Sequence, residues 1–445
     1  MSAVLRFRHI LTAGGVERHQ RLVIGDDGRI ASIEDEPGPE FDGWFALPGL
    51  PNAHSHAFQR ALTGHGEAAR GEDSFWSWRQ AMYGLAAGLT PEDLRAVAAR
   101  AYADMLRAGY TSVAEFHYLH HLPDGSPSPE MGQALIAAAR DAGIRLVLLP
   151  VYYRRGGFGQ PAGPSQRRFV HAGIDDYLRL LEAVSDVPRG IAPHSLRAVD
   201  PAELAPLEAG ATALLGPEFP RHIHISEQRR EVEECLAALG RTPVEALADA
   251  VELGPCWQLV HATHARDAEL ELVAKSGAGV VLCPLTEAYL GDGIFPVRRF
   301  VGLGGRISVG SDSNVRLDAI EELRLLEYGQ RLRDQRRAVL AGPDGLGAPL
   351  WRRCAEGGGA ALGQPAGALA PGYWADIVGL DPGHAVLAGL APSRALDALI
   401  TSGDAACVAD VWVGGVRRVR GGVPVAGDGI GVDYRAALSR LGLDR

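Results

Sequence analysis

Eight short apolar runs alternate with amphipathic stretches, and this alternation limits the possible folds of the chain more than any other feature. The stretches between the runs have helical patterns, and two begin with helix-start signals, Thr90-Pro-Glu-Asp93 and Asp200-Pro-Ala-Glu203. Eight strands that alternate with helices are typical of an α/β protein with a (β/α)8 TIM-like barrel. The runs are residues 45–50, 111–116, 145–152, 190–193, 221–225, 258–262, 279–284 and 306–310.

Both ends of the chain have β patterns instead. Residues 3–9 alternate, and two further short segments flank Gly25-Asp-Asp-Gly28, which is a hairpin signal. Similar patterns return near the C-terminus, at residues 375–380, 408–413 and 416–419. We therefore predict a small β-sandwich domain made from both termini, with residues 1–46 and 371–445 flanking a barrel of residues 47–370.

Composition and charge exclude several classes of protein. The net charge is -10, and Lys and Arg form no long stripe, which argues against a nucleic-acid partner. The N-terminus is not typical of a signal peptide, and no segment has the apolar length of a membrane span, so no membrane partner is expected. The five cysteines are scattered without CxxC spacing, which predicts reduced thiols in a cytoplasmic protein.

Polar side chains stand at the ends of the apolar runs, and the clearest example is His54-Ser-His56. In a barrel these positions lie at the C-terminal mouth, where active sites are built. Residues two apart in a strand point to the same side, so both imidazoles can face one metal ion. The other polar ends are Glu115, His117, His194, His224, Glu227, His261, Thr286, Glu287 and Asp312.

Four of these residues form a candidate metal site. His54, His56, His224 and Asp312 provide three nitrogens and one oxygen, which suit zinc or iron and leave a position for water. Glu227 lies one turn beyond His224, where a carboxylate can shuttle protons to and from that water. His261 ends the sixth run and is expected to face the same water. We therefore predict Glu227, His261 and Asp312 as catalytic residues.

The order of these motifs resembles the amidohydrolase superfamily, and specifically its mononuclear deaminase branch. Pro193-His194-Ser195 stands where binuclear members have a carboxylated lysine, which favours one metal ion. Further segments along essentially the whole chain resemble the formimidoylglutamate deiminases of bacterial histidine degradation. These segments are His54-Ser-His-Ala-Phe-Gln-Arg-Ala61, Phe75-Trp-Ser-Trp-Arg79, Ala114-Glu-Phe-His-Tyr-Leu-His120, His194-Ser-Leu-Arg197, His224-Ile-Ser-Glu-Gln228 and Leu290-Gly-Asp-Gly-Ile-Phe295.

This resemblance implies a substrate, a reaction and a set of contacts. N-formimino-L-glutamate carries two carboxylates, which Arg79 and Arg197 match, because arginine binds carboxylates through two parallel hydrogen bonds. Gln59, Tyr118 and His194 are the other expected substrate contacts. Hydrolytic deimination would give N-formyl-L-glutamate and ammonia. In it Asp312 accepts a proton from the attacking water, His261 polarises that water, and Glu227 carries a proton to the departing nitrogen. The resemblance also implies one divalent metal ion, Zn²⁺ or alternatively Fe²⁺, and a homodimer.

Other interpretations stay open at this point. An aminohydrolase of the same superfamily could act on a purine, pyrimidine or triazine ring, although the arginine pair counts against such a substrate. A catalytically silent scaffold would lose a metal ligand or the carboxylate of Glu227, and all are present. His117, His120 and His121 are left out of the metal site, and Trp76 and Trp78 are expected to wall the pocket or pack a loop. Residues 153–169 form either a lid or an exposed loop.

Overall fold

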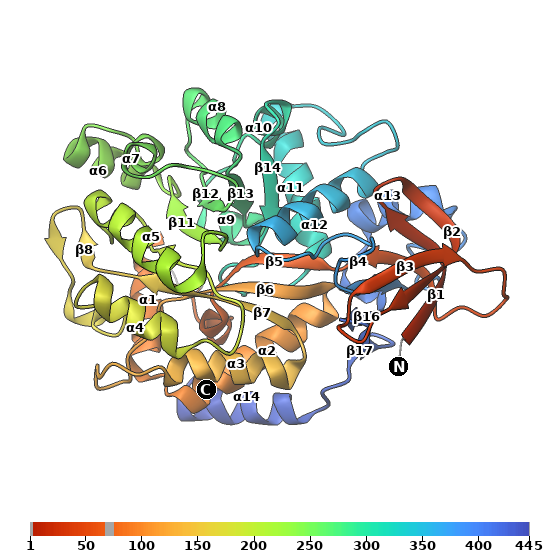
Figure 1. The fold of residues 1–445 in the computed structure, drawn as a ribbon, viewed down its shortest axis with the longest axis horizontal. Helices are drawn as coiled ribbons and strands as arrows, with labels where there is room; N and C mark the ends of the chain where they lie inside the picture. The colour runs from red at the N-terminus through yellow and green to blue at the C-terminus, as the bar shows by residue number, and fades with distance from the viewer. Residues whose placement is uncertain (1–2, 67–74, 445) are drawn as a thin grey trace.

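Parallel strands enclose the centre of the molecule in the computed structural model, which describes residues 3–66 and 75–444, without the side chains of 75–77 (Figure 1). Within these residues, eight strands form two parallel sheets of four. Isolated parallel bridges, Ile191 to Arg221 and Ser55 to Asp312, join the two sheets into a barrel. The predicted fold class is confirmed. The barrel strands are β5 (Leu50–Ser55), β6 (Tyr110–His117), β7 (Arg145–Tyr152), β10 (Ala192–Pro193), β11 (Arg221–Ile225), β12 (Trp257–His261), β13 (Gly279–Leu282) and β14 (Arg306–Val309).

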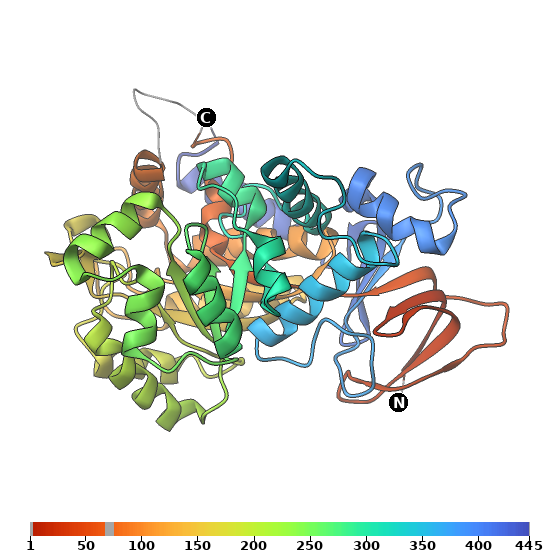
Figure 2. The same cartoon turned by 90° about the horizontal axis from the view of Figure 1, so that it is seen from above.

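Helices connect successive barrel strands and cover the outside of the barrel (Figures 1 and 2). Both predicted start signals are confirmed, since the Thr90 and Asp200 side chains each accept a backbone N–H in the first turn of the helix that follows. The barrel helices are α1 (Phe75–Gly88), α2 (Pro91–Arg107), α3 (Glu130–Ala142), α4 (Ile174–Ala183), α5 (Pro201–Leu215), α6 (Arg229–Leu239), α7 (Pro243–Ala250), α8 (Asp267–Ser276), α9 (Pro284–Leu290), α10 (Val297–Gly302), α11 (Ala319–Asp334) and α12 (Gly347–Ala361). Short elements in the loops are η1 (Ala57–Leu62), β8 (Arg155–Gly157), β9 (Gln160–Pro161) and η2 (Pro164–Gln166).

The two ends of the chain meet in one mixed sheet beside the barrel, as predicted for the small β domain. In the described residues its order is β18-β17-β16-β15-β4-β1-β2-β3, so the C-terminal strands form one half of the sheet and the N-terminal strands form the other, and the antiparallel pairing of β15 with β4 joins them. Figures 1 and 2 show the red N-terminal strands beside the blue C-terminal segment. The strands are β1 (Ala3–Thr12), β2 (Gly15–Ile24), β3 (Ile30–Asp35), β4 (Gly43–Pro48), β15 (Ile377–Leu380), β16 (Val408–Val413), β17 (Val416–Arg420) and β18 (Val423–Pro424).

One predicted strand assignment is wrong. The run 45–50 was expected to form the first barrel strand, but most of it belongs to β4 in the terminal sheet, where it pairs with β1 and β15. The first barrel strand is β5, and Gly49 separates the two strands. Both strands are buried, so one continuous apolar stretch conceals the change from one sheet to the other. The predicted domain boundaries stay predictions, and β4 crosses the one between residues 46 and 47.

The last part of the chain returns to the barrel. Helix α13 (Pro392–Ser402) and the short η3 (Ala405–Cys407) interrupt the terminal sheet, and α14 (Gly429–Arg440) packs against α2, where Arg440 pairs with Asp93 at 2.7 Å. All five cysteines are free thiols. Among the described residues, no helix has both the length and the apolar character needed to cross a bilayer.

Candidate active site

Strands β5, β11 and β14 bring the four predicted metal ligands to one point. The Nε2 atoms of His54 and His56 lie 3.2 Å apart, and Nε2 of His224 lies 3.1 Å from that of His54. Asp312 Oδ1 lies 3.3 Å from His56 Nε2 and 3.6 Å from His54 Nε2. The two histidines of the HxH motif therefore face one point. The third imidazole and the carboxylate come from strands that are distant in the sequence.

The protonation of the imidazoles fits a bound cation. Nδ1 of His56 lies 2.8 Å from the carbonyl oxygen of Phe116, and Nδ1 of His224 lies 3.1 Å from that of His194. A carbonyl only accepts, so each ring carries its proton on Nδ1 and directs the Nε2 lone pair into the cluster. Burial lowers the pKa of all three histidines, that of His56 to about 3, so the rings are neutral as metal ligation requires. The Nε2 lone pairs of His56 and His224 therefore converge beside His54, an arrangement that suits the binding of a cation.

The junction of β14 with β5 places Asp312 beside the histidines. His56 N donates to Asp312 O at 2.9 Å, and Asp312 N donates to His54 O at 3.0 Å. The close approach requires glycine at Gly310, where a Cβ would lie 2.7 Å from the Cβ of His54. Asp312 itself has φ 47° and His261 has φ 69°, values that non-glycine residues rarely adopt. Left-handed backbone at two strand ends is typical of a site in which side-chain direction is fixed at an energetic cost.

His261 lies among three carboxylates. Its Nε2 is 3.9 Å from Glu227 Oε1 and 3.8 Å from Asp312 Oδ2, and its Nδ1 is 3.3 Å from Glu287 Oε1. Burial lowers the pKa of His261, but the carboxylates of Glu227, Glu287 and Asp312 outweigh burial and raise it to about 10. Burial also raises the pKa of Asp312 to about 7, although His261 opposes this shift. The three predicted catalytic residues therefore form one electrostatically linked group.

The predicted substrate contacts line a cavity beside the His/Asp cluster, which is the group of His54, His56, His224 and Asp312. Gln59 donates to the Tyr118 hydroxyl at 2.7 Å. Arg79 Nη2 donates to the Tyr153 hydroxyl at 3.1 Å, and Arg197 Nη2 lies 3.6 Å from Glu227 Oε2. The described residues that line this cavity are His56, Gln59, Trp78, Arg79, Met82, Tyr118, His194, Arg197, His224, Glu227, His261, Leu290 and Asp312.

Several residues of the site were not assigned from the sequence. Met82 and Leu290 line the cavity, and an apolar side chain at helical spacing gives no signal that separates a pocket wall from a core position. Glu287 was noted at the end of the seventh run, but its contact with His261 depends on strand pairing between β12 and β13. Trp78 lines the cavity as one of its two expected roles, whereas the side chain of Trp76 lies outside the described residues.

Two of the remaining histidines, His120 and His121, bind backbone carbonyl groups. His120 Nε2 is 2.8 Å from the Val151 carbonyl oxygen, and His121 Nε2 is 2.8 Å from that of Val170. His120 thus ties the loop after β6 to strand β7, and His121 ties it to the segment that precedes α4. Residues 153–169 form a small hairpin and a 3-10 turn, and Gln166 donates to the Tyr153 hydroxyl at 2.6 Å. Because Tyr153 also contacts Arg79, this segment supports one side of the cavity.

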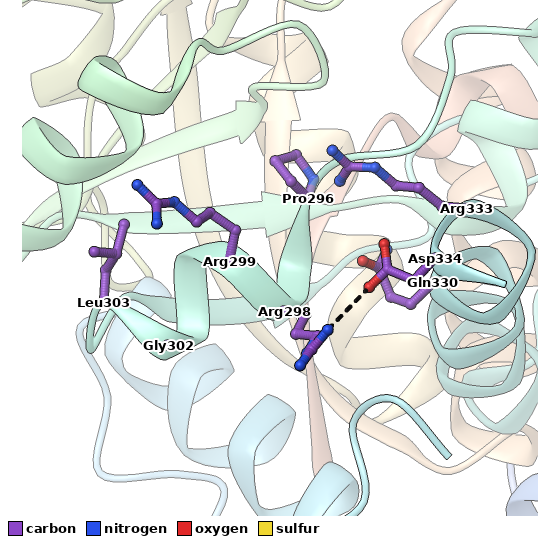
Figure 3. Close-up of a pocket in the computed structure, with 8 residues that line it drawn as sticks. All are labelled: Pro296, Arg298, Arg299, Gly302, Leu303, Gln330, Arg333 and Asp334. Carbon is purple, nitrogen blue, oxygen red and sulfur yellow. Dashed lines mark ion pairs between the residues drawn. The ribbon is translucent and has the colours of Figure 1, made fainter. Parts of the chain in front are cut away.

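A different hollow, of about 430 Å³, lies at the surface between α10 and α11 (Figure 3). Figure 3 shows Arg298 directed toward Asp334, and the two are 3.9 Å apart. The hollow shares no described residue with the metal cluster or its cavity, so we do not assign the chemistry to it. Its lining residues are Pro296, Arg298, Arg299, Gly302, Leu303, Gln330, Arg333 and Asp334.

The fold and the His/Asp cluster define a barrel hydrolase that uses a metal, and comparison with known families agrees. Residues 45–418 match the model of the amidohydrolase family, so the chain belongs to that family.

Individual relatives are more specific. The chain is 45% identical to a formimidoylglutamate deiminase of Pseudomonas aeruginosa, over 95% of both proteins. It superposes on the crystal structure of an amidohydrolase from Brucella melitensis with a TM-score of 0.92 and 42% identity, over 98% of this chain and 99% of the other. An adenosine deaminase from Xanthomonas campestris with bound zinc has a TM-score of 0.81 and 22% identity, over 99% and 98% of the two chains. This last likeness bears on the fold alone.

Proposed function

We infer that the protein is a metal-dependent formimidoylglutamate deiminase, which hydrolyses N-formimino-L-glutamate to N-formyl-L-glutamate and ammonia. The observation that carries this function is one buried cavity that joins the His/Asp cluster to two arginines, in a chain 45% identical to such an enzyme. The cluster suits hydrolysis of a C=N bond, and the arginines suit a substrate with two carboxylates.

We propose that His54, His56, His224 and Asp312 hold one divalent cation. When bound, this cation would activate a water molecule at neutral pH and polarise the substrate. Three neutral imidazoles and one carboxylate form a donor set that zinc prefers, and Fe²⁺ is the alternative for the same donors.

The protein's own residues then move the protons. Asp312 accepts the proton that the attacking water loses, and His261 holds that water by a hydrogen bond from Nε2. A bond forms between the water oxygen and the formimino carbon. The imino nitrogen needs two protons to depart as ammonia, and both come from the water. Asp312 passes on the first, and Glu227, beside Arg197 and facing His261, carries the second from the new hydroxyl group when the C–N bond breaks. The atoms of water and N-formimino-L-glutamate are all accounted for in N-formyl-L-glutamate and ammonia.

Arg79 and Arg197 are proposed to bind the two carboxylates of the substrate, with Gln59, Tyr118 and His194 as further contacts. A charged side chain fixed away from the reacting carbon orients that carbon before the reaction, so binding energy contributes to the rate. A purine, pyrimidine or triazine ring carries no carboxylate for these two guanidinium groups to bind. The arginines therefore favour the dicarboxylate.

Ammonia release from N-formimino-L-glutamate tests the function. Purified protein is assayed as isolated, after removal of metal by a chelator, and after re-addition of Zn²⁺ or Fe²⁺, with guanine and cytosine in parallel. We expect release from the glutamate derivative alone, lost on chelation and restored by one metal ion per chain. Release only from a ring would keep the metal chemistry but contradict the substrate and the roles of the arginines.

Two expectations from the sequence stay proposals. The resemblance implies a homodimer, which the molar mass of the purified protein in solution would test. The free cysteines agree with a cytoplasmic location, which fractionation of the producing cells would test.

A further inference from the structure

Glu287 is a buried carboxylate behind the site that has no role in the proposed reaction. It lies in the first turn of α9 and is 6% exposed. Its Oε1 is 3.3 Å from His261 Nδ1 and also accepts the backbone N–H of Cys283 at 2.9 Å. On its other side it borders an apolar hollow of about 360 Å³, with neighbours such as Leu282 and Phe295. Glu287 is absent from the lining of the catalytic cavity, so it reaches the chemistry through His261.

The hydrogen bond from His261 determines which ring nitrogen faces the cavity. A carboxylate accepts, so Nδ1 of His261 carries the proton that binds Glu287. Nε2 is then directed to the opposite side, toward Glu227 Oε1 at 3.9 Å and Asp312 Oδ2 at 3.8 Å. Without an acceptor at Nδ1, the ring could rotate about its side-chain bonds, and the direction of Nε2 would no longer be fixed. Such supporting carboxylates fix the ring orientation and tautomer of functional histidines in many sites.

We propose that Glu287 is a positioning residue, which holds His261 in the orientation that presents Nε2 to the reacting atoms. The proposal rests on the proposed function, because it assigns Glu287 to the same reaction. The alternative is a purely structural role for Glu287, because its hydrogen bond to the Cys283 N–H would by itself stabilise the start of helix α9. The two roles require separate tests, because removal of the side chain affects both.

A matched control residue on a neighbouring helix supports the same turn of α9. Glu322, on α11, is fully buried, and its Oε2 accepts the N–H of Leu285 at 2.9 Å. In the described residues this carboxylate is hydrogen-bonded to the start of α9 and not to His261. Glu322→Gln and Glu322→Ala therefore disturb the support of α9 without touching the histidine.

Steady-state kinetics and metal content of four variants test the proposal. Glu287→Ala is expected to lower kcat by about 10- to 100-fold with roughly unchanged KM and unchanged metal content, since supporting residues typically have effects of this size. Glu287→Gln keeps an oxygen acceptor for both N–H groups and should recover most of the lost kcat. The Glu322 variants should lower the melting temperature with less effect on kcat. The proposal is overturned if Glu287→Gln is as slow as Glu287→Ala, if KM rises in place of the fall in kcat, or if Glu322→Ala reproduces the kinetic loss.

A spectroscopic measurement separates this proposal from the proposed function. The ¹H and ¹⁵N chemical shifts of the His261 ring, assigned by comparison with His261→Asn in metal-loaded protein, report whether Nδ1 is protonated and hydrogen-bonded. Wild type and Glu287→Gln should have a protonated Nδ1 with the downfield signal of a hydrogen-bonded N–H, and Glu287→Ala should lose this hydrogen-bonded signal. A wild type that releases no ammonia contradicts the proposed function, whereas an unprotonated Nδ1 in the wild type contradicts the role of Glu287 whatever the substrate. Because Glu287→Gln retains the acceptor geometry, the test stands even if Glu287→Ala fails to fold.

Discussion

Glu227 and Arg79 illustrate how single side chains divide the work of the proposed site. Glu227 lies between His261 and Arg197, at 3.9 and 3.6 Å, where the proposed reaction has it carry a proton to the departing nitrogen. Arg79 extends from α1 and donates a hydrogen bond to the Tyr153 hydroxyl in the cavity wall. The first residue should therefore control the chemical step, and the second should control recognition of the substrate.

Glu227→Gln removes the proposed proton carrier and leaves the shape of the cavity. We expect kcat to fall by about 10²- to 10⁴-fold, the usual contribution of a positioned acid or base, with a small change in KM. Metal content should not change, because Glu227 is outside the ligand set. Steady-state kinetics and metal analysis of the same samples check this. A loss of metal would instead place Glu227 among the ligands.

Arg79→Met removes a cation from the cavity wall. Hydrogen bonds to charged groups contribute about 1.5–3 kcal/mol, so kcat/KM should fall by about 10- to 100-fold, mainly through a higher KM. Arg298→Met is the control, since Arg298 lies in the separate surface hollow (Figure 3). Equal kinetics for Arg79→Met and wild type would exclude Arg79 from carboxylate binding.

Between elements, the contact of β14 with β5 decides whether the metal ligands meet. Gly310 allows this contact, since a Cβ there would lie 2.7 Å from His54 Cβ and 2.8 Å from the backbone N and O of His54. Two of the four ligands, His54 and Asp312, come from the strands that meet at this point.

Gly310→Ala should therefore separate β14 from β5. We expect a lower melting temperature, less bound metal and a matching loss of activity, since overpacking costs about 1–3 kcal/mol. Gly302→Ala is the matched control, because a Cβ at the end of α10 would meet nothing within 4 Å. Normal metal content in Gly310→Ala would show that the strands adjust without moving the ligands.

Across the whole molecule, buried neutral histidines should make the fold sensitive to acid. Burial and the neighbouring His121 lower the pKa of His171 from 6.5 to about 4, although Asp176, at 3.5 Å, opposes the shift. The unfolded chain then takes up a proton between pH 6.5 and 4 that the folded chain does not. Stability from this group is complete above pH 6.5 and is lost as the pH falls toward 4.

Urea unfolding at several pH values between 7.5 and 4.5 checks this prediction. The free energy of unfolding should fall toward low pH, and each such histidine contributes at most about 1.4 kcal/mol per pH unit. His171→Gln removes one group that takes up a proton on unfolding. The free energy of unfolding of this variant should therefore depend less steeply on pH than that of the wild type. Identical slopes would mean that His171 is not held neutral in the fold.

The terminal sheet and the barrel are tied together by residues that no local pattern links. Arg145 on β7 pairs with Asp376 at 3.1 Å, and its guanidinium lies 3.7 Å from the centre of the Trp374 ring. Asp376 is buried and also accepts the N–H of Gly414. A contact between residues 231 positions apart depends on the closed barrel and on the meeting of the two termini.

The sequence by itself determined the barrel and much of its site. Strand and helix periodicity are local properties, so eight alternating runs were sufficient for the fold class. His54 and His56 share one side of a strand because successive side chains alternate, and their convergence follows from the backbone alone. Polar residues at the ends of the runs marked His224, His261 and Asp312, because parallel strands in a barrel end at one mouth.

Only the tertiary structure decided which strands pair and which distant side chains come into contact. The run 45–50 is apolar throughout, so periodicity could not distinguish β4 in the terminal sheet from β5 in the barrel. The protonation of His56 and His224 depends on carbonyl groups of Phe116 and His194, which strand register brings near. Glu287 meets His261 only because β12 and β13 are neighbours. Such contacts depend on distances between segments far apart in the chain, and these distances exist only after the barrel has closed.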